Sequence, residues 1–142
     1  MTSRNKLNCI LLVDDDPDDN FLHELVIKES SAEAKVVVAE NGEHAWQYLS
    51  NPQRPDFWKP SVIFLDINMP RMNGFEFLEL FKTLPESTRA ATKVVVLTTS
   101  SHPQDQEKVS SIYQEAEYRT KPLTSEILFD VLGSESPRFS AR

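Results

Sequence analysis

Acidic side chains crowd together near the start of the chain. The segment LLVDDDPDDN, residues 11–20, holds five aspartates among its ten residues and continues an apolar run. Carboxylates this close together repel one another, and their charge beside a hydrophobic strand is costly unless a cation offsets it. Carboxylate oxygens are the ligands that Mg²⁺ and Mn²⁺ prefer. The segment therefore needs positive charge nearby.

Polar side chains directly follow four of the apolar runs, including the first. Asp14 and Asp15 follow the first run, Asp66 follows VIFL, Thr98 follows KVVVL, and Lys121 follows the short run YRT. If these runs are parallel strands, their carboxyl ends meet at one edge of a sheet. We therefore expect three carboxylates, a hydroxyl and an ammonium to lie together. The lysine and a divalent cation would make three close carboxylates tolerable.

A calcium-binding EF-hand loop is the main rival explanation for such a cluster. Started at Asp14, that loop would need a glycine where the chain has Asp19 and a glutamate where it has Leu25. The EF-hand reading therefore fails. We assign Asp18 and Asp19 to the first turn of a helix, where negative charge is favourable without any ligand. Three histidines are scattered along the chain, and we expect them to be exposed: His23, His44 and His102.

Apolar periodicity predicts strands that alternate with helices. The expected strands cover residues 8–13, 35–39, 62–65, 93–97 and 118–120, and the expected helices cover 17–29, a segment opening at Gly42, 74–84, 104–114 and 125–132. In the first helix, Phe21, Leu22, Leu25 and Val26 fall on one face, which we expect to pack on the core. This alternation predicts an α/β fold with a doubly wound five-stranded parallel sheet in the order 2-1-3-4-5.

Composition and charge exclude several classes of protein. The chain of 142 residues fits one domain, and its formal charge of −7, with a pI of about 4.9, argues against a nucleic-acid-binding face. No apolar run approaches the roughly 20 residues of a membrane span. The sequence lacks the apolar core of a signal peptide and has a single cysteine, so we expect a cytoplasmic protein. We expect Cys9 to be a small buried hydrophobe.

Four motifs in the expected order give the chain a family resemblance. VDDDP, FLDINMPRMNG, VLTTSS and TKPL resemble the receiver domain of two-component response regulators. The resemblance covers about residues 5–132 and implies the flavodoxin-like receiver fold. We expect residues 133–142 to be a poorly ordered tail, because they are polar and contain Pro and Gly.

The resemblance implies a role for each acidic residue at the expected site. Asp66 would be the phosphoacceptor, attacking a phosphohistidine on a sensor histidine kinase. Asp15 and Asp66 would bind Mg²⁺ through their side chains, and Asn68 through its backbone carbonyl. Asp14 would complete the metal site through a metal-bound water.

The same resemblance implies roles for three residues on the last two strands. Lys121 would pair with the phosphoryl oxygens, and the Lys121–Pro122 peptide bond would be cis. The Thr98 hydroxyl would hydrogen-bond a phosphoryl oxygen. Tyr118 would be the aromatic residue that changes rotamer on activation.

These roles describe a single-domain response regulator that switches its binding to a target protein or relays phosphate to a histidine phosphotransfer protein. It would not be an enzyme, beyond assisting its own phosphorylation and dephosphorylation, and a homodimer is left open. One alternative is an aspartate-dependent phosphohydrolase or phosphotransferase, which would be expected to carry an acid where this chain has Asn68. Another is a receiver-like interaction module that takes no phosphate, which would normally have lost an acid, Thr98 or Lys121.

Overall fold

The computed structural model describes residues 9–30, 33–99 and 102–132 of the 142-residue chain. The elements in chain order are β1 (Cys9–Val13), α1 (Pro17–Ser30), β2 (Lys35–Ala39), α2 (Gly42–Leu49), β3 (Val62–Leu65), α3 (Gly74–Phe81), α4 (Glu86–Ala90), β4 (Lys93–Thr98), α5 (Pro103–Ile112), β5 (Glu117–Thr120) and α6 (Ser125–Leu132). The expected tail, residues 133–142, lies outside the described residues.

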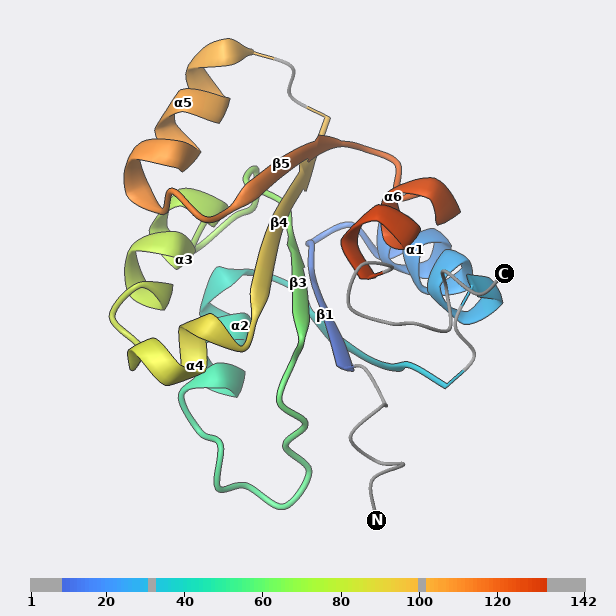
Figure 1. Ribbon diagram of the computed structural model, residues 1–142, viewed down its shortest axis with the longest axis horizontal. Coiled ribbons are helices and arrows are strands. Elements are labelled where there is room, and N and C mark those ends of the chain that lie inside the picture. Colours follow the sequence, from blue (N-terminus) through green and yellow to red (C-terminus); the bar gives the residue numbers. More distant parts are fainter. Residues whose placement is uncertain (1–8, 31–32, 100–101, 133–142) are drawn as a thin grey trace.

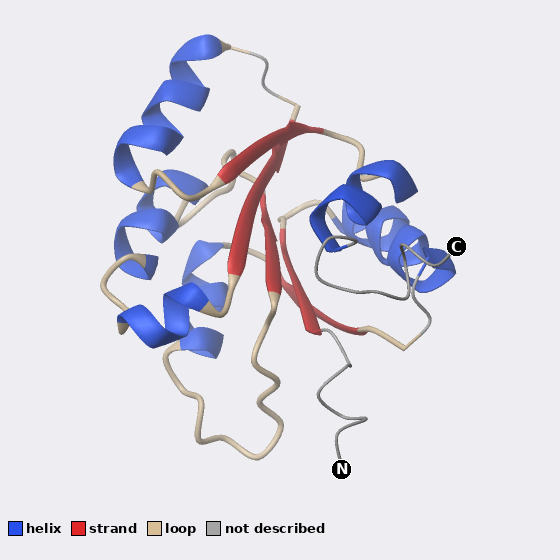
Figure 2. Cartoon of the chain, viewed as in Figure 1, coloured by secondary structure: helices blue, strands red, loops and turns tan. Residues whose placement is uncertain are grey.

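The strands form one parallel sheet in the order β2-β1-β3-β4-β5. Helices α1 and α6 cover one face of this sheet, and α2, α3, α4 and α5 lie on the other (Figures 1 and 2). The expected α/β fold, parallel sheet and strand order are therefore confirmed.

Alternate strand residues supply two separate cores, one under each helical layer. Leu11 and Val13 of β1 join the cluster that includes Phe77 and Phe81 of α3, whereas Ile10 and Leu12 join the cluster on the α1 and α6 side. Because both faces of the sheet are covered, every residue of β1 and β3 is buried. This double burial explains why these strands read as unbroken apolar runs.

The prediction that one apolar face of α1 packs on the core is wrong for three of its four residues. Phe21, Leu22 and Leu25 are 66%, 52% and 44% exposed, and only Val26 is partly buried against the core. The helix instead turns Ile27, which is fully buried, toward the sheet. Apolar side chains one turn apart were therefore a misleading guide to which side of α1 faces inward.

Two polar residues lie on the buried side of α1 beside Ile27. The Asn20 side-chain amide donates a hydrogen bond to the Asp14 carbonyl oxygen at 2.9 Å, which ties the buried side of α1 to the end of β1. His23, one turn further on, is only 3% exposed, so the expectation that it is exposed is wrong. His44 and His102 are exposed, as expected.

The segment between α3 and β4 contains a helix that the apolar pattern does not predict. The helix expected over residues 74–84 ends at Phe81, and α4 begins after Pro85. Proline cannot donate the backbone hydrogen bond of a helix interior, and it disfavours helical geometry in the residue before it. Pro85 therefore separates two short helices.

The long loop between α2 and β3, residues 50–61, is held by one tyrosine. The Tyr48 hydroxyl accepts a hydrogen bond from the Trp58 backbone N–H at 2.6 Å and donates one to the Trp58 carbonyl at 2.7 Å. The Tyr48 ring also packs against Phe57, with centroids 4.9 Å apart. Cys9 is buried nearby, as expected, and its Sγ lies 3.7 Å from the Trp58 carbonyl oxygen.

The loop that leaves β3 returns tightly against that strand at Gly74. The Gly74 N–H donates a hydrogen bond to the Ile67 carbonyl at 3.1 Å, and Asn73 and Glu76 cap α3 reciprocally. A Cβ atom on Gly74 would lie 2.6 Å from the Ile67 Cα and 2.7 Å from the Asp66 carbonyl oxygen. Only glycine allows this close approach of α3 to the end of β3.

We expect Gly74→Ala to destabilise the fold by about 1–3 kcal/mol, because the added Cβ meets backbone atoms that cannot rotate away. Urea unfolding followed by circular dichroism measures this difference. Ser87→Ala, at an exposed position of α4, is the matched control and should change the free energy of unfolding little. Equal stabilities for Gly74→Ala and the wild type would contradict the steric account.

Candidate functional site

Three carboxylates meet where β1 and β3 end. Side-chain oxygens of Asp14, Asp15 and Asp66 all lie within 4.8 Å of one another. Asp14 and Asp66 are buried, at 4% and 8% exposure, whereas Asp15 is exposed. The structure thus brings together the acids that the sequence pattern placed at one sheet edge.

Backbone hydrogen bonds at the strand ends hold the two buried acids. The Asp14 N–H donates to the Ala39 carbonyl at 3.0 Å, and the Asp66 N–H donates to the Val13 carbonyl at 2.9 Å. Each bond extends the strand pairing by one residue beyond the last strand position. The two carboxylates therefore emerge from neighbouring strands at the same level of the sheet.

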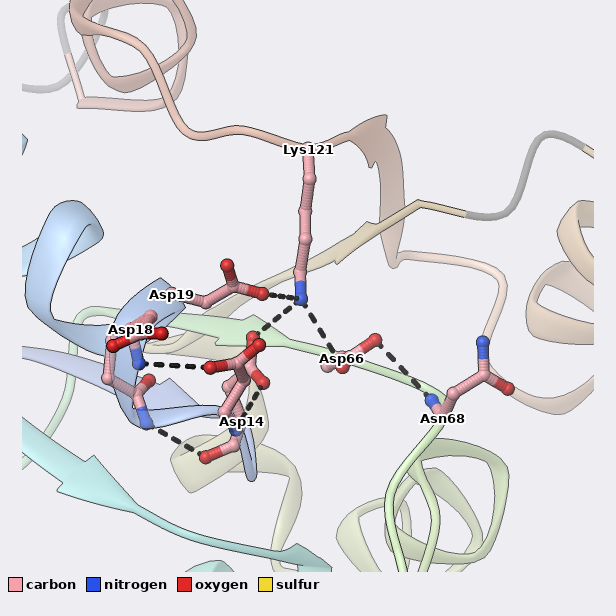
Figure 3. Close-up of polar contacts among 8 residues, drawn as sticks. Asp14, Asp18, Asp19, Asp66, Asn68 and Lys121 are labelled. Carbon is pink, nitrogen blue, oxygen red and sulfur yellow. Dashed lines mark hydrogen bonds and ion pairs between the residues drawn. The ribbon is translucent and has the colours of Figure 1, made fainter.

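Lys121 brings a positive charge to these acids from the segment after β5. Its Nζ atom lies 2.7 Å from Asp14 Oδ2 and 3.4 Å from Asp66 Oδ2 (Figure 3). Its backbone N–H donates to the Thr98 carbonyl at 2.8 Å, and the Lys121–Pro122 peptide bond is cis, as the resemblance implied. The lysine side chain is only 9% exposed, so this charge lies inside the site.

Asp19 also contacts the lysine, and the sequence analysis did not place it there. Its Oδ2 atom lies 2.7 Å from Lys121 Nζ (Figure 3). Asp18, the preceding residue, is exposed, and its backbone N–H donates to Asp16 Oδ1 at 2.9 Å. The assignment of Asp19 to a helix turn without a partner is therefore wrong, although its place in the first turn of α1 is correct.

Burial and charge together shift the pKa values of the two central groups. Burial raises the pKa of Asp66; the Lys121 charge lowers it and the Asp14 charge raises it further, and the net shift is upward. Burial alone would lower the pKa of Lys121, but hydrogen bonds to Asp14 and Asp19 and the Asp66 charge outweigh it and raise that pKa. The lysine is therefore firmly cationic, and Asp66 gains from additional positive charge when ionised.

The remaining residues expected at the site surround this group. The Asn68 backbone N–H donates to Asp66 Oδ1 at 3.4 Å, and its side chain points away from Asp66 in Figure 3. Thr98 is fully buried at the end of β4. Tyr118 pairs with Val96 in the sheet and packs, partly buried, against the core cluster shared with α3 and α5. Their roles toward a phosphoryl group stay predictions.

The donor set fits a hard divalent cation. Three carboxylates within reach of one ion offer only oxygen ligands, which suit Mg²⁺ and Mn²⁺ rather than metals that prefer sulfur or imidazole. Asp15 is the most exposed of the three, so an ion could reach the site from solvent. The carboxylates also exceed the single ammonium paired with them, which favours binding of a cation.

Comparisons with known proteins agree with this geometry. A family model described as the response regulator receiver domain matches residues 10–132. The chain is 33% identical to response regulator Rcp1 of Synechocystis sp. over 102 residues, which is 71% of this chain and 68% of Rcp1.

Among the described residues, none of the helices is both long and apolar enough to cross a bilayer.

Solved structures of response regulators are similar over most of this chain. A two-component response regulator from Cytophaga hutchinsonii is 31% identical with a TM-score of 0.78, covering 94% of this chain and 98% of that one. The Mn²⁺-bound form of response regulator Rcp1 is 30% identical with a TM-score of 0.69, covering 89% and 90%.

The raised pKa of Asp66 predicts a pH-dependent stability. The folded chain holds this proton more tightly than the unfolded chain, so the contribution of Asp66 to stability falls as pH rises above the ordinary aspartate pKa of 3.8. We expect Asp66→Asn, which cannot ionise, to have a larger free energy of unfolding than the wild type at neutral pH in EDTA. Urea unfolding across pH should show the difference shrinking toward acid pH.

The same experiment has a metal control. A Mg²⁺ concentration of about one hundred times its Kd should raise the free energy of unfolding of the wild type by about 2.7 kcal/mol. Asp66→Asn should gain less, because one carboxylate ligand is missing. A wild type that is the more stable of the two in EDTA at neutral pH would contradict the electrostatic account.

Proposed function

Because the chain belongs to the family of response regulator receiver domains of two-component systems, we propose that it accepts a phosphoryl group on Asp66 and then alters its binding to a partner protein. The observation that carries this proposal is the site itself. A buried carboxylate at the end of β3 lies beside two acids that suit a metal and 3.4 Å from a lysine ammonium. Phosphoryl transfer requires positioning and neutralisation of charge more than further covalent chemistry.

In the transfer step, an Asp66 carboxylate oxygen attacks the phosphorus of a phosphohistidine on a sensor histidine kinase. A P–O bond forms, the P–N bond breaks, and the histidine nitrogen leaves with the electron pair. Lys121 offsets negative charge on the transferred oxygens, and the Thr98 hydroxyl donates a hydrogen bond to one of them. Later attack of water on the phosphorus releases inorganic phosphate and restores Asp66.

Mg²⁺ is the cofactor that we propose for this step. Asp14, Asp15 and Asp66 would hold it, Asp14 through a bound water, and the backbone carbonyl of Asn68 would be a further ligand. The ion supplies positive charge that offsets the charge of the phosphoryl oxygens. The similar protein Rcp1 has been solved in a Mn²⁺-bound form, which supports a divalent ion as the cofactor of this chain.

The switch would pass from Thr98 to Tyr118. A phosphoryl group that draws the Thr98 hydroxyl toward Asp66 changes the end of β4, which is paired with β5. Tyr118 lies on that neighbouring strand and is only partly buried, so a change of its rotamer would carry the effect of phosphorylation to the surface. Phosphorylation would then favour one of two packings of this region.

The proposed partners are a sensor histidine kinase and either a target protein or a histidine phosphotransfer protein, in the cytoplasm. Asn68 disfavours a phosphohydrolase or phosphotransferase, which would be expected to carry an acid at that position. The presence of all the acids together with Thr98 and Lys121 disfavours a module that takes no phosphate. We propose one receiver domain over residues 5–132, consistent with the family match over residues 10–132.

A small phosphodonor with Mg²⁺ tests the proposal directly. We expect phosphoramidate to label the wild type once, and Asp66→Asn to carry no label, because the nucleophile is lost. Intact-protein mass spectrometry counts the phosphoryl groups, and borohydride trapping of the acyl phosphate locates the acceptor. A wild type that takes no label, or an Asp66→Asn variant that keeps it, would remove the basis for the proposal.

The exposed apolar residues of α1 offer a docking surface for the kinase. Phe21, Leu22 and Leu25 lie on the helix that begins directly beyond Asp14 and Asp15. A phosphohistidine must approach the site closely, so a kinase bound there has to lie against the neighbouring surface. Large apolar side chains that are exposed together commonly mark a protein interface.

We expect Phe21→Ser combined with Leu25→Ser to slow phosphotransfer from the cognate kinase about tenfold, because apolar contact area is lost. Labelling by phosphoramidate should stay unchanged, since that donor needs no docking surface. Trp58→Ser is the matched control, because Trp58 is 39% exposed and belongs to the loop of residues 50–61. That loop precedes β3 and lies at the end of the sheet opposite the carboxyl ends of the strands (Figure 1). Equal loss with both donors would point to damage at the site instead.

A further inference from the structure

The lysine at the site is shared among three acids that differ in exposure. Lys121 Nζ lies 2.7 Å from Asp14, 2.7 Å from Asp19 and 3.4 Å from Asp66. The Asp14 and Asp66 side chains are 6% and 9% exposed, whereas the Asp19 side chain is 31% exposed. Asp19 is therefore the partner that can move away into solvent most easily.

The ammonium has three N–H donors and three carboxylate partners, so its hydrogen-bonding capacity is used before any substrate arrives. A phosphoryl group at Asp66 needs at least one of these donors. Asp14 and Asp66 also belong to the cluster of oxygens within 4.8 Å that suits a metal, and Asp19 does not. Displacing Asp19 is thus the exchange that leaves the metal-binding acids in place.

We propose that Asp19 is a positioning residue that holds Lys121 in the unphosphorylated protein and that the incoming phosphoryl group displaces it. This inference rests on the function proposed above and adds a restraint to it. The Asp19 carboxylate and the phosphoryl oxygens compete for the same ammonium, so the phosphodonor must break one ion pair to bind. Asp19 thereby weakens the binding of the donor. Phosphorylation of Asp66 consequently needs a higher concentration of donor.

Asp18 provides the matched control for this idea. It precedes Asp19 in the first turn of α1, carries the same charge and has the same relation to the helix dipole. Its backbone N–H bonds to Asp16, and the ion pairs of Lys121 do not include it. Replacing either acid by asparagine removes one negative charge from the same turn, but only Asp19→Asn removes a lysine partner.

The decisive experiment is the rate of Asp66 labelling as a function of phosphoramidate concentration, at fixed Mg²⁺, for the full chain. We expect Asp19→Asn to lower KM about fivefold, the range of one partly exposed ion pair, with kcat little changed. Asp18→Asn should match the wild type. Equal KM values for Asp19→Asn and the wild type, or an equal fall in both variants, would overturn the proposal.

A second comparison tests whether the effect passes through the lysine. In a Lys121→Ala background, Asp19→Asn should no longer change KM, because the competition for the ammonium is gone. A fall in KM that persists there would assign the effect to general charge repulsion and refute the proposed role.

A third measurement needs no phosphorylation. Trace acetylation by acetic anhydride, mapped by mass spectrometry, should modify Lys121 several-fold faster in Asp19→Asn than in the wild type or Asp18→Asn. Unchanged reactivity would show that Asp19 does not restrain the lysine. The two proposals can fail separately. If the wild type took no label on Asp66 but Lys121 was acetylated faster in Asp19→Asn, the proposed function would be wrong and the restraint of Lys121 by Asp19 would be supported.

Discussion

One buried ammonium is the constraint on which the site depends. Aspartates from just after β1, from the first turn of α1 and from just after β3 approach a common point, and Lys121 from beyond β5 lies among them. Without that charge the buried carboxylates would repel one another more strongly, since burial and the Asp14 charge both raise the pKa of Asp66 and the Lys121 charge lowers it. The parallel sheet matters here because it brings segments distant in sequence to one edge.

Much of this arrangement could be predicted from the sequence because parallel strands follow simple rules. The runs that precede Asp14 and Asp66 are apolar on both faces, so they had to be central strands, and central parallel strands place their last residues side by side. The positions of Lys121 and Thr98 followed from the same rule, applied to strands whose neighbours were known. The acids at the strand ends could therefore be found without any knowledge of side-chain contacts.

The errors arose where side-chain contacts, rather than backbone order, decide the outcome. In α1, apolar residues on one face predicted the buried side, but the helix buries Asn20, His23 and Ile27 instead. The Asn20 bond to the Asp14 carbonyl satisfies a polar group on that inward side, and Phe21 is exposed. The helix dipole alone explains an acidic residue at position 19, so nothing in the sequence indicated the contact between Asp19 and Lys121. Helix α4 is too short for a periodic pattern to show.

The contact between Lys121 and Asp19 joins residues 102 positions apart. A ribosome makes the chain from its N-terminus, so the acids of β1, α1 and β3 are all synthesised before the only ammonium that pairs with them in the described part of the chain. During that interval these carboxylates lack Lys121, the partner that they have in the folded chain. A nascent polypeptide consequently cannot form the contacts around Lys121 Nζ until the segment after its fifth strand has been translated, so these ion pairs join the chain only once the whole parallel sheet has been synthesised.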